Sequence, residues 1–197
     1  MKKFKRISVA AVVGTAVLLA AASAWAGSCC GGSQTRVMHE KSSASAHSKD
    51  RDSSSFLKSY FEIRSVLASD KVTGLDKLSK NLAGQTSKFR KTLGTGPNDE
   101  ARPEQLAALK DIEKAALAMK VSDIKVAREG FKDLSRTVLA YVKSYGCDGP
   151  AYSFYCDMAK ESWLQETNKI GNPYFGSQML ACGAMTGHMM NGKYMAN

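Results

Sequence analysis

Residues 122–145 read SDIKVAREGFKDLSRTVLAYVKSY, and this stretch decides the fold that the sequence predicts. Ser122 and Asp123 supply N-cap chemistry at its start. Its apolar residues recur at steps of seven, three, four, four and three, namely Ile124, Phe131, Leu134, Val138, Val142 and Tyr145. That spacing places them on one face of an α-helix, which must be buried against other apolar surfaces.

Three further helices are predicted upstream of this one. Residues 56–67 carry apolar side chains at three-four spacing, and a second helix starts at the cap residues Ser69-Asp70 and ends near residue 93. After a Gly/Pro/Asn/Asp break at 94–99, Pro103 suits the first turn of a third helix. Four helices with short connections bury one another's apolar faces. The sequence therefore predicts an all-α fold, an antiparallel four-helix bundle.

The N-terminus has the pattern of a secretory signal peptide. Four basic residues lie in residues 1–6, an apolar run follows over 7–22, and Ala24-Trp25-Ala26 fits a signal-peptidase site. The run is too short for a permanent membrane span. We therefore expect residues 1–26 to be a signal peptide cleaved after Ala26, a mature chain in the periplasm and no membrane span after cleavage. Lipidation at Cys29 is the alternative, but Ala26 stands where a lipoprotein signal usually has Leu.

Export lowers the charge that the mature chain carries. The whole chain has a formal net charge of +10, and loss of the four basic residues in the signal leaves 24 basic against 18 acidic residues, a net charge of +6. These charges are spread along helices, which favours a solvated basic surface and no nucleic-acid partner. Residues 27–55 are rich in Ser, Gly, Ala and Lys, and are predicted to be a flexible tether.

The last third of the chain differs from the helical region. Gly, Pro, Tyr and Phe are dense after residue 146, and helical periodicity fades. We expect an irregular segment packed on one end of the bundle, so that residues 56–183 form one domain and 184–197 a Met/His-rich tail that is unstructured without metal. The expected aromatic anchors are Tyr152, Phe154, Trp163, Tyr174 and Phe175.

Soft metal ligands gather in the same segment. Cys156 and Met158 can converge on one ion from a turn, and Met179 and Cys182 lie on one face of a helical turn. Thiolate and thioether together select Cu(I) over hard ions. The spacing therefore predicts a Cu(I) site. Met185 and Met189 continue the helical face of Met179, with His188 beside them, as additional candidate ligands.

The motifs of this segment resemble a known family. The chain reads FYCDMA at 154–159, WLQ at 163–165 and IGNPYFGSQMLACG at 170–183. Their order and spacing are similar to the signature of the domain-of-unknown-function family numbered 3347, which reads approximately YCPMA, YWL, NPYFG and MLxCG. Asp157 departs from the family's Pro, and Cys147 is not part of the signature. The resemblance extends more weakly to the fourth helix.

The family resemblance implies a bacterial envelope protein. Such domains occur alone or fused to periplasmic membrane-fusion (adaptor) proteins of heavy-metal efflux systems. The resemblance therefore implies such an adaptor as a partner besides the metal ion. We expect a periplasmic protein that binds Cu(I), and by the same soft-ligand chemistry Ag(I), and that sequesters copper or passes it to an efflux adaptor.

A structural disulfide is the main alternative to the metal site. In an oxidising compartment Cys156 and Cys182 can bridge, and Cys147 can pair with Cys156 instead. The protein is then a disulfide-stapled helical interaction module of the cell envelope with no metal role. Catalysis is not expected, because the histidines at 39, 47 and 188 accompany no triad or zinc-hydrolase motif.

Overall fold

The computed structural model of the chain describes residues 53–93 and 102–197. The predicted signal peptide with its cleavage site, the cysteines at 29 and 30, most of the tether and the break at 94–99 lie outside these described residues. Within the described ranges, no helix combines the length and hydropathy needed to cross a membrane.

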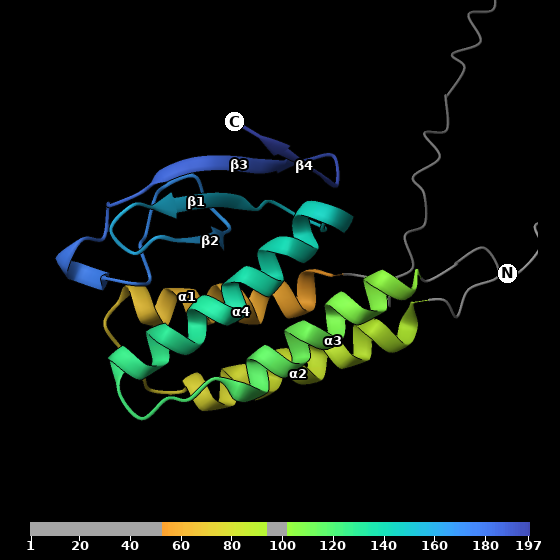
Figure 1. Ribbon diagram of the computed structural model, residues 1–197, viewed down its shortest axis with the longest axis horizontal. Coiled ribbons are helices and arrows are strands. Elements are labelled where there is room, and N and C mark those ends of the chain that lie inside the picture. The colour runs from red at the N-terminus through yellow and green to blue at the C-terminus, as the bar shows by residue number, and fades with distance from the viewer. Residues whose placement is uncertain (1–52, 94–101) are drawn as a thin grey trace, which may run out of the picture. The chain divides into compact units, whose positions relative to one another are not determined.

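Four helices form the first half of the described chain (Figure 1). They are α1 (Ser54–Ala68), α2 (Leu75–Thr92), α3 (Pro103–Ala118) and α4 (Ile124–Tyr145). Each helix packs against the next one along the chain. The sequence prediction of four helices is confirmed, and α1 begins two residues earlier than expected.

The predicted caps are confirmed at α4 and wrong at α2. The Asp123 carboxylate accepts a 2.9 Å hydrogen bond from the backbone N–H of Val126, and Pro103 occupies the first turn of α3. Ser69, in contrast, follows the last turn of α1, and α2 starts only after Gly74. Asp70 adopts a left-handed conformation with φ of 58°, which Asp tolerates better than most residues. The pair therefore ends α1 and does not begin α2.

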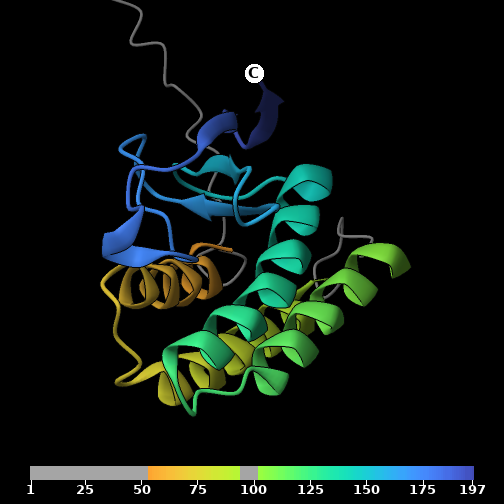
Figure 2. The same cartoon turned by 60° about the vertical axis from the view of Figure 1, so that its left-hand side comes forward.

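The all-α prediction is wrong, because the C-terminal part forms a four-stranded antiparallel sheet. The strands are β1 (Tyr152–Cys156), β2 (Glu161–Gln165), β3 (Ala184–Met190) and β4 (Lys193–Ala196), in the order β2-β1-β3-β4. The sheet packs on α1 and α4, with α2 and α3 on the other side of these two helices (Figures 1 and 2). Cross-strand aromatic pairs stabilise it. Phe154 lies opposite Trp163, and their rings stack with centroids 5.5 Å apart.

The predicted unstructured tail is a β-hairpin. Met190 pairs with Lys193, so the connection between β3 and β4 is the two residues Asn191-Gly192. Both have positive φ, 51° and 74°, as a type I′ turn requires. Asn-Gly between short strands is a strong local hairpin signal, and it is this dipeptide that the prediction of an unstructured tail overlooked.

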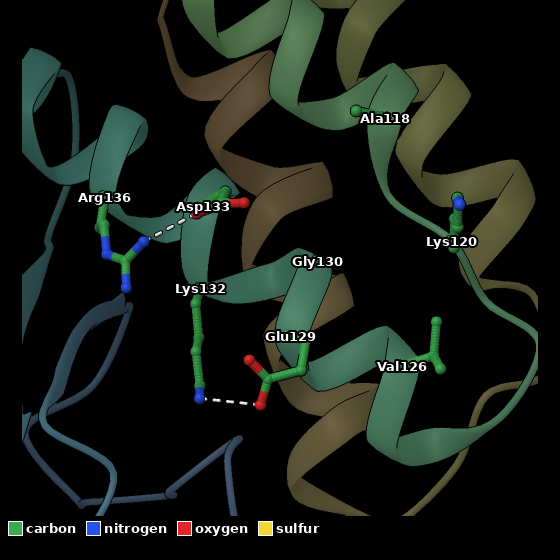
Figure 3. A pocket seen from close by; sticks show the side chains of 8 residues that line it. All are labelled: Ala118, Lys120, Val126, Glu129, Gly130, Lys132, Asp133 and Arg136. Carbon is green, nitrogen blue, oxygen red and sulfur yellow. Dashed lines mark hydrogen bonds and ion pairs between the residues drawn. The ribbon is translucent and has the colours of Figure 1, made fainter.

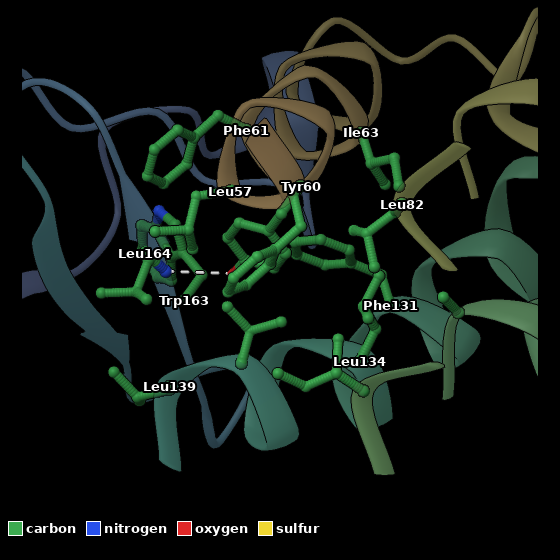
Figure 4. Close-up of a cluster of buried hydrophobic side chains, with 14 of the residues drawn as sticks. Leu57, Tyr60, Phe61, Ile63, Leu82, Phe131, Leu134, Leu139, Trp163 and Leu164 are labelled. Carbon is green, nitrogen blue, oxygen red and sulfur yellow. Dashed lines mark hydrogen bonds between the residues drawn. The ribbon is translucent and has the colours of Figure 1, made fainter. Parts of the chain in front are cut away.

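One continuous core joins the helices to the sheet (Figure 4). Tyr60 of α1 is fully buried, and its hydroxyl accepts a 3.1 Å hydrogen bond from the backbone N–H of Leu164 in β2. The same hydroxyl lies 2.7 Å from the Ser135 hydroxyl of α4. The C-terminal segment is therefore built into the helical core. Of the expected anchors, Phe154, Trp163 and Tyr174 are buried, while Tyr152 and Phe175 are half-buried.

Candidate functional site: a pair of contacting thiols

Cys156 occupies the last position of β1 and is fully buried. Its backbone pairs with Glu161 across the β1–β2 hairpin. The four residues 157–160 form the loop, and Lys160 takes a left-handed conformation with φ of 53° that returns the chain into β2. The ladder on one side and the tight loop on the other fix where the Cys156 sulfur lies.

Cys182 reaches the same point from a turn near the other end of the segment. Its backbone N–H donates a 2.9 Å hydrogen bond to the carbonyl of Met179, which closes the turn 179–182 just before β3. Gly183 follows with φ of 141°, and a Cβ there would come within 2.8 Å of the Trp163 ring. The close approach of the backbone to this ring therefore requires glycine at the position that follows the half-buried Cys182.

The two sulfur atoms are in contact. The Cys156 Sγ lies 3.4 Å from the Cys182 Sγ, and both cysteines are free thiols in the structure. A disulfide requires about 2.05 Å. Two thiolates on one tetrahedral ion, with metal–sulfur bonds of about 2.3 Å, are about 3.8 Å apart. The observed separation lies between these values, so the pair can close on itself or open slightly around an ion.

Hydrogen bonding shifts the pKa values of the two thiols in opposite directions. Burial acts to raise the pKa of Cys156, but donors outweigh it and lower that pKa: the backbone N–H groups of Ala159 and Met158, the Cys182 thiol and the Asn172 amide. The pKa of Cys182 is raised, first because its thiol hydrogen-bonds to Cys156. Hydrogen bonding therefore favours the thiolate form of Cys156 over that of Cys182.

Asn172 connects the two cysteine-bearing segments and was not among the predicted site residues. It is fully buried, its Nδ2 donates a 2.9 Å hydrogen bond to the Cys182 carbonyl, and its Oδ1 accepts one of 2.8 Å from the backbone N–H of Tyr174. Its own backbone N–H donates to the Leu180 carbonyl at 2.8 Å. Asn followed by Pro is a turn signal that could have identified this residue.

A second set of polar contacts ties the segment to the helices. Arg128 of α4 donates from Nε to the Pro173 carbonyl at 2.9 Å and from Nη2 to Asp70 at 2.6 Å. The Asp70 carboxylate also accepts a 2.9 Å bond from the backbone N–H of Ser177, in the 3₁₀ turn Gly176–Gln178. Hydrogen bonds from Ser177 and then Arg128 lower the pKa of Asp70 to about 2. The loop that carries Asn172 is therefore held at a fixed position.

The predicted methionine ligands Met158 and Met179 flank the thiols in sequence but differ in exposure. Met158 is 66 % exposed and lines a hollow of about 240 Å³ with Tyr174, Phe175 and residues of α4. Met179 is half-buried and begins the turn that ends at Cys182. This region is a β-turn and not the helical turn expected from the sequence. Both side chains leave the backbone within a few residues of the thiol pair.

The three remaining candidate ligands lie on β3. Met185 is opposite Phe154, and His188 is opposite Tyr152, with which its ring stacks. The expected helical face through Met185 and Met189 is therefore wrong, because strand geometry replaces it. From Cys156 to Tyr152 is four residues along β1, about 13 Å. His188 and Met189 are thus not brought to the thiol pair, and Met185 lies about two residues, roughly 7 Å, from it along the strand direction.

Other positions in the described residues are weaker candidates for a metal or catalytic site. No group of three or more His, Cys, Asp and Glu side chains comes together there. Cys147 is buried beyond the end of α4, and burial raises the pKa of its thiol to about 12. A hollow of about 290 Å³ along α4 (Figure 3) is lined by small apolar residues and charged side chains, four of which pair with one another. Lys132 binds Glu129 at 2.8 Å, and Arg136 binds Asp133 at 2.7 Å.

Comparison with known proteins identifies the family. The sequence profile described as "Protein of unknown function (DUF3347)" matches residues 56–148. Residues 56–148 therefore form a domain of this family, as the motif resemblance implied. The matched residues cover the helices and end before the Cys/Met segment. No curated protein and no solved structure matches the chain.

Proposed function

We propose that this protein is a periplasmic carrier of soft monovalent metal ions, Cu(I) first and Ag(I) by the same chemistry. The observation that carries the proposal is the contact of the Cys156 and Cys182 sulfur atoms at 3.4 Å. Two thiols so placed form a bidentate soft site after a small opening, and thiolate strongly prefers Cu(I) to hard ions. The metal is cargo in this proposal, and no catalytic step is involved.

The two cysteines differ in burial, and this difference suits a site that binds a metal ion and releases it again. Cys156 is fully buried with N–H donors around its sulfur, whereas Cys182 is half-buried at the end of a turn. In this proposal Met158, two residues after Cys156 and 66 % exposed, supplies a thioether to the ion. The buried Cys156 sulfur would therefore be the restrained ligand, and Cys182 and Met158 would be the ligands that solvent can reach. A transfer partner exchanges ligands most easily at such an open side.

The compartment and the partner belong to the same proposal. The signal-like N-terminus supports export, and the family resemblance supports an efflux adaptor as the acceptor of the ion. A disulfide-stapled interaction module without metal is the competing function. The same 3.4 Å contact is compatible with it, so the two are separated by experiment.

The test is an anaerobic competition titration of Cu(I) against a chromophoric chelator, on the reduced mature chain and on single variants. Cys156→Ser and Cys182→Ser should each weaken binding more than Met158→Leu or Met179→Leu, because thiolate is the stronger ligand. Cys147→Ser is the matched control and should leave the affinity unchanged. Binding that is insensitive to Cys156→Ser and Cys182→Ser would reject this site.

A further inference from the structure

We propose that Cys156 and Cys182 also undergo thiol–disulfide exchange with low-molecular-weight disulfides, with Cys182 reacting first and Cys156 completing the bridge. This activity requires no metal ion and goes beyond the proposed carrier function. It rests on three features of the described residues: the contact between the sulfurs, the difference in their accessibility, and the different rigidity of the two backbones that carry them.

The first feature is the contact itself. The sulfurs are 3.4 Å apart and a disulfide needs about 2.05 Å, so they must approach by about 1.4 Å. Rotation about the Cα–Cβ bond of a cysteine moves its sulfur by a comparable distance. No rearrangement of the sheet is therefore needed to close the bridge.

The second feature is accessibility. Cys156 is fully buried, so a disulfide in solution cannot reach its sulfur. Cys182 is half-buried, and its neighbours on the turn, Leu180 and Ala181, are exposed. Of these two cysteines, only Cys182 can make the first contact with an external disulfide, and its half-buried position favours a small disulfide over a folded protein.

The third feature is the difference in backbone restraint. Cys156 is locked by its ladder pairing with Glu161. Cys182 belongs to no strand, and it is held by the Asn172 amide and by the turn bond to Met179. The buried Cys156 sulfur therefore stays next to Cys182 while the accessible Cys182 sulfur forms and breaks its bond to the external group. This is the arrangement that allows rapid resolution of a mixed disulfide.

The exchange balances in two steps. The Cys182 thiol loses its proton, and its sulfur attacks the external disulfide, forming a mixed disulfide and releasing one external thiolate. The Cys156 thiol then loses its proton, and its sulfur attacks the Cys182 sulfur and displaces the second external thiolate. The protein loses two electrons, and the external disulfide gains them and becomes two thiols after protonation. The product has no thiolate left at this site, so oxidation also removes the proposed metal ligands.

The experiment uses the reduced, metal-free mature chain and glutathione disulfide as the probe. The reaction is quenched with acid, free thiols are alkylated, and peptides are mapped by mass spectrometry. The wild-type chain should acquire a Cys156–Cys182 bridge, with no glutathione retained on either of these two cysteines. Cys156→Ser should retain one glutathione on Cys182, because nothing resolves the mixed disulfide. Cys182→Ser should leave Cys156 unmodified, and Cys147 should stay free throughout.

Several results would overturn the proposal. One such result is that glutathione modifies Cys156 in the Cys182→Ser variant as fast as it modifies Cys182 in the Cys156→Ser variant. Equal rates would contradict the proposed order, in which Cys182 reacts first. A bridge that excess reduced glutathione does not reopen would identify a structural disulfide. Circular dichroism of each variant, with Cys156→Ala as a second replacement, separates loss of reaction from loss of fold. Exchange without Cu(I) binding would reject the carrier function alone, and Cu(I) binding without exchange would reject this inference alone.

Discussion

Replacement of Asn172 by Asp tests how the structure positions the thiols. The carboxylate keeps an acceptor for the Tyr174 N–H but removes the donor that Asn172 offers to the Cys182 carbonyl at 2.9 Å. An unpaired carbonyl of this kind costs about 1–3 kcal/mol, and burial of the new carboxylate adds to this cost. Loss of a donor and addition of a negative charge should also raise the pKa of Cys156. Protonation of the introduced carboxyl restores a donor, so the stability deficit should shrink as the pH falls.

Two measurements check the Asn172→Asp variant: urea unfolding over a range of pH, and thiolate absorbance in a pH titration. Asn168→Asp is the matched control, because Asn168 is exposed in the same loop and undergoes the same change of charge. The control should leave both the free energy of unfolding and the thiolate titration close to those of the wild type. If Asn172→Asp behaves like Asn168→Asp in both assays, then Asn172 does not position the thiols.

Three further predictions concern the scaffold that carries the site. Asp70→Asn should lower the urea midpoint at neutral pH. The pKa of Asp70 in the folded chain is about 2, below its usual 3.8. The difference in unfolding free energy between wild type and variant should therefore be complete above pH 3.8 and vanish as the pH falls through 2. Tyr60→Phe should cost about 1–3 kcal/mol of unfolding free energy by leaving the buried Leu164 N–H unpaired, and a cost near zero would contradict the link between α1 and the sheet. Gly176→Ala should destabilise, since φ is +56° and a Cβ would collide with Asp70, whereas Gly84→Ala on an open helix face should stabilise by about 0.5–1 kcal/mol; the reverse order in thermal melts would refute the local geometry.

The helices could be predicted from the sequence because their signals are local. The apolar spacing from Ile124 to Tyr145 and the cap at Asp123 act within a few turns. The sheet was missed because its strands are four to seven residues long and lie among Gly and Pro residues. Pairing β1 with β3 joins residues about thirty positions apart, and no local pattern encodes that choice.

The site, like the fold, could be predicted only where local sequence patterns determine it. Residue type and spacing pointed to Cys156 and Cys182, and the fold brings them into contact. Extending a helical period through Met185, His188 and Met189 failed, because a bulged antiparallel pairing with β1 sets their positions. The partners that fix the thiols, such as Asn172 and the contact of Arg128 with Asp70, depend on tertiary structure, since Arg128 and Asp70 are 58 residues apart.

Cys156 and Cys182 are proposed to bind one soft metal ion together. The most direct measurement is the Cu(I) stoichiometry and affinity of the reduced mature chain beside a Cys156→Ser, Cys182→Ser double variant, under the same anaerobic competition with a chromophoric chelator. We expect one tight equivalent in the wild-type chain that is lost in the double variant, with the helical circular dichroism retained. Equal stoichiometry and affinity in the two proteins would contradict it.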